Sequence, residues 1–100
     1  MDKKLELDGK IVFDLKATYG LPLEIIIDRV MNEEGLNITW PDFIEEARKN
    51  NWLDEQIFKT IKYGIEESML ERDIKEIIIE KTMLYLMTYP NNFINHTGVN

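Results

Sequence analysis

The sequence predicts a small all-α protein, a compact bundle of four to five helices. Apolar residues recur at spacings of three and four along most of the chain, which is the period of an amphipathic helix. Glycine, proline and paired asparagine residues interrupt these runs where helices are expected to end. With 44% apolar residues among 100, the chain can bury a core, so we expect a single helical domain over residues 1–90.

The first two predicted helices meet at a tight corner. The first starts after Asp8, an N-cap type of residue, and Gly20 follows it where a helix favours a left-handed residue. Pro22 suits the first turn of the next helix, which Gly35 ends. Tyr19, Gly20 and Pro22 therefore define the corner. The expected buried residues of the two helices are Ile11, Val12, Leu15 and Tyr19, then Ile25, Ile26, Val30 and Met31.

The third and fourth helices follow the same logic. Thr39 and Asp42 approximate a capping box, and Asn50 with Asn51 ends the third helix. The fourth opens at Leu53 and Asp54. The residues expected to face the core are Phe43, Ile44 and Ala47, then Ile57, Phe58, Ile61 and Ile65.

The last apolar stretch leaves two arrangements open. Ser68 and Glu71 form a capping box that can start a fifth helix, or residues 54–89 form one long bent helix that Pro90 ends. The final turns are apolar nearly all round, so we expect this helix to join copies of the chain in a homo-oligomer. The expected interface residues are Ile74, Ile77, Ile78, Leu84 and Tyr85. Residues 91–100 are polar and predicted to form a flexible tail, with Phe93 and Ile94 as anchors.

Composition narrows the class of protein. The formal net charge is −7, from 19 acidic and 12 basic side chains spread along the whole chain, and this disfavours general nucleic-acid affinity. There is no cysteine, hence no disulfide and no thiolate metal site. No secretory leader and no membrane-spanning apolar run is recognisable. We expect a cytoplasmic protein without a cofactor, a metal or a membrane contact.

Catalysis finds little support in the residues. His96 is the only histidine, and it lies in the predicted tail without a neighbouring carboxylate. The adjacent glutamate pairs diverge by about 100° around a helix, so they do not form acid–base pairs. No Gly-rich phosphate loop or nucleophile–histidine motif occurs. The sequence therefore predicts a non-enzyme.

One cluster has the composition of an anion-binding site. Cations, amides and an indole together can hold a phosphate and stack a base. The alternative is that Arg48 and Lys49 complement a helix end while Trp52 anchors the core. The candidate ligand-binding residues are Arg48, Lys49, Asn51, Trp52, Lys59 and Lys62.

Residues 9–45 resemble the helical tRNA-recognition region of alanyl-tRNA synthetases. The likeness rests on the corner motif and on later positions of the second and third helices. Two departures stand out: Ala17 replaces the family's acidic residue, and Leu21 replaces the aromatic residue before the proline. The matching residues are Phe13, Leu15, Thr18, Tyr19, Gly20, Pro22, Leu23, Gly35, Leu36 and Phe43.

Two functions follow as hypotheses. The first is a non-catalytic adaptor or inhibitor that binds a host protein or sequesters a small anionic ligand, in a phage or mobile-element setting by analogy with other short synthetase-like proteins. The second, which the resemblance implies, is a stand-alone RNA-binding module that contacts a tRNA acceptor stem. The acidic balance and Ala17 favour the first over the second.

Overall fold

The computed structural model describes residues 5–91, so the predicted tail lies outside the described residues except for Asn91. Most of this part is helical, which confirms the all-α prediction. The elements are β1 (Glu6–Leu7), α1 (Gly9–Ala17), α2 (Leu23–Ile27), the π-helix η1 (Asp28–Glu33), β2 (Asn37–Ile38), α3 (Trp40–Lys49), α4 (Asp54–Glu67) and α5 (Arg72–Thr88).

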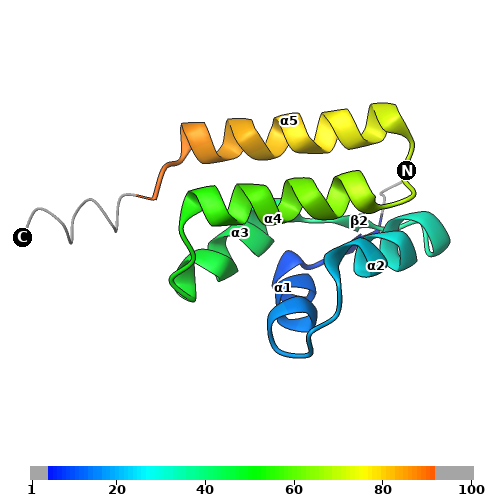
Figure 1. Ribbon diagram of the computed structural model, residues 1–100, viewed down its shortest axis with the longest axis horizontal. Helices are drawn as coiled ribbons and strands as arrows, with labels where there is room; N and C mark the ends of the chain where they lie inside the picture. Colours follow the sequence, from blue (N-terminus) through cyan, green and yellow to red (C-terminus); the bar gives the residue numbers. More distant parts are fainter. Residues whose placement is uncertain (1–4, 92–100) are drawn as a thin grey trace, which may run out of the picture.

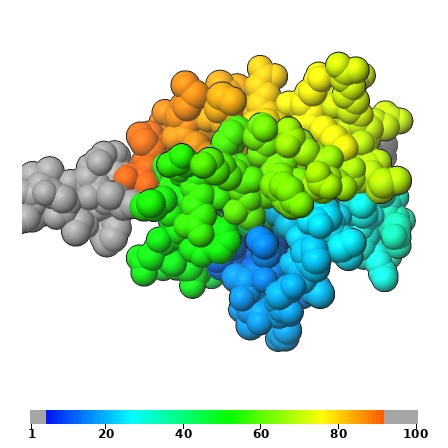
Figure 2. Space-filling model, in the orientation of Figure 1, coloured from blue at the N-terminus to red at the C-terminus, as the bar shows by residue number. Residues whose placement is uncertain are grey.

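The helices form layers around α4 (Figure 1). α5 runs back along α4 after a short turn, α2 packs on α4, and α1 packs on α3. In the space-filling view α5 covers one long edge of α4, while α1 and α2 lie along the opposite edge (Figure 2). Phe43, Ile44, Ile57, Ile61 and Ile65 are fully buried between these layers, as their helical spacing predicts.

A short parallel pairing joins the two ends of the first half of the chain. β1 pairs with β2, Glu6 opposite Asn37 and Leu7 opposite Ile38. Each strand is two residues long, so neither shows the alternation that would reveal it in the sequence. Because α1 begins two residues after β1 and α3 begins two residues after β2, the pairing brings the starts of these two helices together.

The predicted corner is present. The carboxylate of Asp8 accepts the amide hydrogen of Lys10 at the start of α1. At its end Gly20 has φ +72°, and the Leu21 amide donates to the Leu15 carbonyl at 3.1 Å. This is the usual way in which a left-handed glycine satisfies the last carbonyls of a helix.

The buried faces of the first two helices differ from the prediction in three residues. Ile11, Ile25 and Tyr19 are 49%, 57% and 68% exposed. Tyr19 lies beyond the end of α1, where the helical stripe no longer continues. Across α2 and η1 the buried residues are Leu23, Ile26, Ile27 and Val30, at spacings of three and four, which leaves Ile25 on the outer face. The residues buried instead are Phe13, Leu23 and Ile27.

The last two helices are separate rather than one long helix. Of the two arrangements that the sequence leaves open, separate helices are observed, but Ser68 does not cap α5: its hydroxyl donates to the Ile65 carbonyl at 2.7 Å, and it is the C-cap of α4. Glu71 is the N-cap residue of α5. The capping-box prediction is therefore wrong in its detail, because the serine serves the preceding helix.

We expect Gly20→Val to lower the free energy of unfolding by more than about 1 kcal/mol, because a β-branched residue is strained at positive φ. No heavy atom lies within 4 Å of the added Cβ position, so the cost comes from the backbone alone. Urea denaturation measures the change. Gly20→Asn is the control, since asparagine tolerates this conformation; an equal loss in both variants would contradict the explanation.

Candidate functional site

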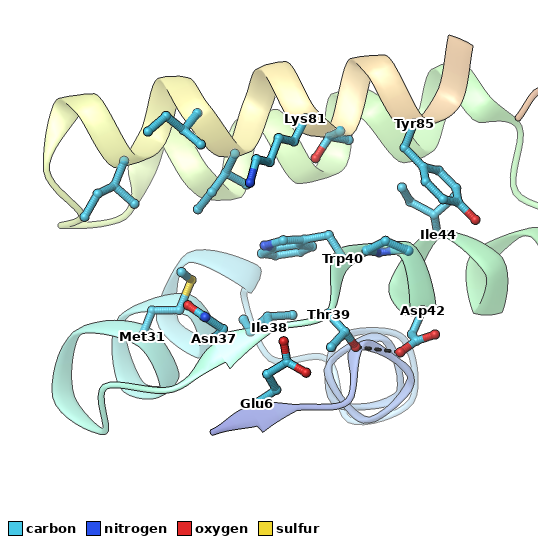
Figure 3. Close-up of a pocket in the computed structure, with 15 residues that line it drawn as sticks. Glu6, Met31, Asn37, Ile38, Thr39, Trp40, Asp42, Ile44, Lys81 and Tyr85 are labelled. Carbon is cyan, nitrogen blue, oxygen red and sulfur yellow. Dashed lines mark hydrogen bonds between the residues drawn. The ribbon is translucent and has the colours of Figure 1, made fainter. Parts of the chain in front are cut away.

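A groove of about 600 Å³ lies between α5 on one side and β2 with the start of α3 on the other (Figure 3). Its volume falls within the range of small-molecule sites. The lining is mostly apolar and comes from five elements, β1, η1, β2, α3 and α5, so the tertiary structure assembles it. The aliphatic lining residues are Met31, Ile38, Ile44, Ile74, Ile77 and Ile78.

Two buried polar atoms of the groove lining have no hydrogen-bond partner among residues 5–91. They are the indole Nε1 of Trp40 and the hydroxyl Oγ1 of Thr82, in side chains that are 8% and 2% exposed. A buried polar group without a partner costs about 1–3 kcal/mol, and native proteins contain few of them. Their presence in one groove marks it as a site where a polar group of another molecule can be accepted.

The charged side chains of the groove lie on opposite walls. Lys81 extends from α5 toward the Trp40 ring, and Glu6 lies on the opposite wall (Figure 3). No ion pair between residues 5 and 91 involves Lys81. Asp42 is engaged, because its carboxylate accepts the Thr39 hydroxyl at 2.6 Å. Lys81 is thus the cation available to a ligand in this groove.

A second, smaller cleft of about 400 Å³ lies beside the predicted corner, between the α1–α2 junction and α4. Lys16 and Lys59 line it together with Pro22, Glu24 and Tyr63. Tyr63 is 60% exposed, and Tyr19 on the same corner is 68% exposed. The tertiary structure therefore gathers two cations and an aromatic ring at the segment that resembles the synthetase, with a second exposed ring nearby.

Arg48 of the predicted anion-binding cluster is committed to partners within the chain. Its guanidinium donates to both carboxylate oxygens of Asp54 at 2.9 and 3.0 Å, to Glu45 at 3.0 Å and to the Tyr89 carbonyl at 2.7 Å. Burial lowers the pKa of Arg48, but the hydrogen bond and attraction of Asp54 and the attraction of Glu45 outweigh it and raise the pKa overall. Arg48 joins the end of α3 to the start of α4 and to the end of α5.

The other members of that cluster do not converge on one surface. Trp52 is half-buried and packs edge-on against Phe13, with ring centroids 5.2 Å apart. Asn51 has φ 67° and forms the turn after α3. Lys59 and Lys62 face Glu55 and Glu66 at 3.4 and 3.1 Å, in exposed pairs that contribute little stability. Lys49 is the last residue of α3, and its side chain is exposed. Ligand binding by this set stays a prediction.

The predicted interface residues of α5 divide between core and surface. Ile78 is 9% exposed and belongs to the core, whereas Ile74, Ile77 and Leu84 are 39%, 51% and 54% exposed. Tyr85 is half-buried, and its hydroxyl donates to Glu45 at 2.6 Å. Burial and this hydrogen bond raise the pKa of Tyr85 to about 12. An interface through α5 stays a prediction, and Leu84 is its most accessible predicted residue.

Among residues 5–91 no three histidine or acidic side chains lie close enough together to hold a metal ion. No helix in this range is both long and apolar enough to span a bilayer. His96 lies outside the described residues.

Comparison with known proteins gives one local likeness. Over 61 residues, 61% of this chain, the sequence is 36% identical to the alanine–tRNA ligase of Mycoplasma genitalium. The match spans about 7% of the length of that enzyme. No protein-family model and no solved structure matches the chain. The comparison supports a resemblance to a short part of the ligase.

We expect Arg48→Met to lower the free energy of unfolding by roughly 2 kcal/mol, since it removes several charge-assisted hydrogen bonds from a side chain that is only 10% exposed. Lys49→Met removes the same charge from the neighbouring exposed position and should change it by less than about 0.5 kcal/mol. Urea denaturation of the two variants measures the difference. Equal stabilities would mean that the Arg48 contacts are energetically neutral.

Proposed function

We propose that this chain is a non-catalytic RNA-binding module that contacts the acceptor arm of a tRNA through the corner between α1 and α2. The observation that carries the proposal is the position of Tyr19. This tyrosine matches the synthetase-like motif, yet it is 68% exposed and adds nothing to the core. A corner needs Gly20 for its backbone, but it does not need an exposed aromatic ring.

The side chains around the corner have the chemistry for such a contact. An exposed aromatic ring offers a stacking surface to an unpaired base, and Tyr63 provides a second ring on α4. Lys16 and Lys59 line the cleft at this corner and can each face a phosphate. An acceptor arm presents both features, because its paired stem ends in an unpaired 3′ strand.

The acidic balance sets the expected strength of binding. Glu24 lines the same cleft, and Glu55 lies 3.4 Å from the Lys59 ammonium. Two phosphate contacts supply only a small electrostatic term, so stacking must provide much of the affinity. Ala17 stands where the synthetase motif has an acid, so we propose recognition of the arm's shape and end rather than of one base pair.

The test is binding of a fluorescent RNA hairpin that copies an alanine acceptor stem with its unpaired 3′ end, followed by anisotropy at increasing salt. The logarithm of the binding constant should fall against the logarithm of salt with a slope of about −2, for two phosphates. Tyr19→Ala and Tyr63→Ala should each weaken binding roughly fivefold or more, which is the loss of one stacked base.

Tyr89→Ala is the matched control, because Tyr89 is 59% exposed at the far end of α5. It should leave the affinity unchanged. Removing the unpaired 3′ strand from the hairpin should weaken binding to the unmodified protein at least as much as either tyrosine substitution does. Equal effects of all three tyrosine substitutions, or no binding at low salt, would refute the proposal.

A protein partner is the second candidate, either a second copy of this chain or a host protein that an adaptor or inhibitor would bind. The observation in its favour is the outer face of α5, where Met83, Leu84 and Met87 are 43%, 54% and 69% exposed. Neighbouring exposed apolar side chains on one helix are typical of association surfaces. An α5–α5 contact with two-fold symmetry is the simplest form.

If this face joins two copies, Leu84→Glu should convert a dimer into a monomer with unchanged helix content. Light scattering at high micromolar concentration gives the mass, and circular dichroism gives the helix content. Leu84 is exposed in the single chain, so its substitution leaves the core intact, unlike a substitution of the buried Ile78. A monomer before any substitution would leave self-association without support.

A further inference from the structure

The shape and lining of the groove between α5 and α3 fit an elongated apolar molecule. The groove follows α5 from Ile74 to Tyr85, which is roughly 16 Å at the rise of an α-helix. The apolar part of its lining is aliphatic apart from Trp40 and Tyr85. A straight hydrocarbon chain of medium length matches this space better than a compact polar metabolite would.

The polar groups of the groove indicate the chemistry of the ligand's polar terminal group, called here its head. The Trp40 indole offers a hydrogen-bond donor and the Thr82 hydroxyl can also donate, and neither has a partner within residues 5–91. Lys81 contributes a positive charge on the same helix as Thr82, and its side chain extends toward the Trp40 ring (Figure 3). Donors and a cation together call for an anionic acceptor.

The charge of the head is limited by the opposite wall. Glu6 and Asp42 both line the groove, so a phosphate dianion would meet two carboxylates with one lysine to balance it. A carboxylate carries one charge spread over two oxygens, each able to accept hydrogen bonds. We propose that this groove binds an aliphatic monocarboxylic acid, with its carboxylate at Lys81 and the Trp40 N–H and its chain along Ile74, Ile77 and Ile78.

Entry requires only local movement. The Nε1 and Oγ1 atoms are shielded from solvent, so the head reaches them by displacing part of the lining. Met31 and Lys81 are long, unbranched side chains of that lining and can change conformation at low cost. The remaining aliphatic walls are isoleucines on α3, α5 and β2.

The probe is octanoate, used below its micelle concentration, and the readout is the indole N–H signal in proton–nitrogen NMR spectra. The chain has two tryptophans, and Trp52→Phe assigns their signals. Octanoate should shift the Trp40 signal in a saturable manner while the Trp52 signal stays in place. Octan-1-ol, which has the same chain and no charge, should bind at least about tenfold more weakly.

Two variants test the head directly. Lys81→Met should weaken octanoate binding at least about tenfold and abolish the preference for octanoate over octanol. Thr82→Val keeps the shape of the side chain and removes its hydroxyl, so it should weaken octanoate binding without loss of thermal stability. The amide signals of the rest of the chain report whether each variant is folded.

Lys59→Met separates this inference from the RNA proposal. It removes a lysine from the corner cleft, so it should weaken RNA binding and leave octanoate binding unchanged, while Lys81→Met should do the reverse. No saturable shift of Trp40, equal shifts of both tryptophans, or equal affinities for octanoate and octanol would each overturn the inference. A Trp40 shift that depends on protein concentration alone would assign the groove to a second copy of the chain.

Discussion

The close contact between the start of α1 and the start of α3 is the constraint on which the rest of the structure depends. A Cβ atom added to Gly9 would collide with the Thr39 carbonyl oxygen and with the Phe43 amide nitrogen, so only glycine allows the two backbones this close. The Gly9 amide donates to the Thr39 hydroxyl at 2.9 Å, and β1 pairs with β2 immediately before this point. Backbone hydrogen bonds and close packing thus fix the two helices together at one end.

The position of the groove follows from that contact. With the helix starts fixed, Phe13 meets Phe43 edge-on at 5.4 Å, and Trp40, one residue beyond Thr39, lies beneath α5 in the groove. Arg48 closes the opposite end of α3 onto α4 and α5. The groove therefore lies beside a helix, α3, that is held to its neighbours at both ends. The corner cleft uses other surfaces, those of α1, α2 and α4, so a ligand in one site need not exclude a ligand from the other.

Local signals predicted the element boundaries well. Asp8, Gly20, Gly35 and Asn51 end or begin elements as expected, because capping and positive φ depend on a few neighbouring atoms. Ser68 was misassigned, since a serine between two helices can serve either of them. The sites were harder to predict. A cluster that is contiguous in sequence, from Arg48 to Trp52, turned out to be divided between an ion-pair network and core packing.

The sequence alone determined the helical class, the corner and the resemblance of residues 9–45 to a tRNA ligase segment. Each of these depends only on residue types and on their spacing over a short stretch of chain. Only the tertiary structure decided which apolar residues are exposed, such as Tyr19 and Ile25, and which polar groups are left without partners, such as Trp40 and Thr82. These properties depend on how helices distant in sequence cover one another. Lys16 and Lys59 line one cleft, and Trp40 and Lys81 line one groove, although about 40 residues of chain separate the members of each pair, a separation that no local pattern encodes.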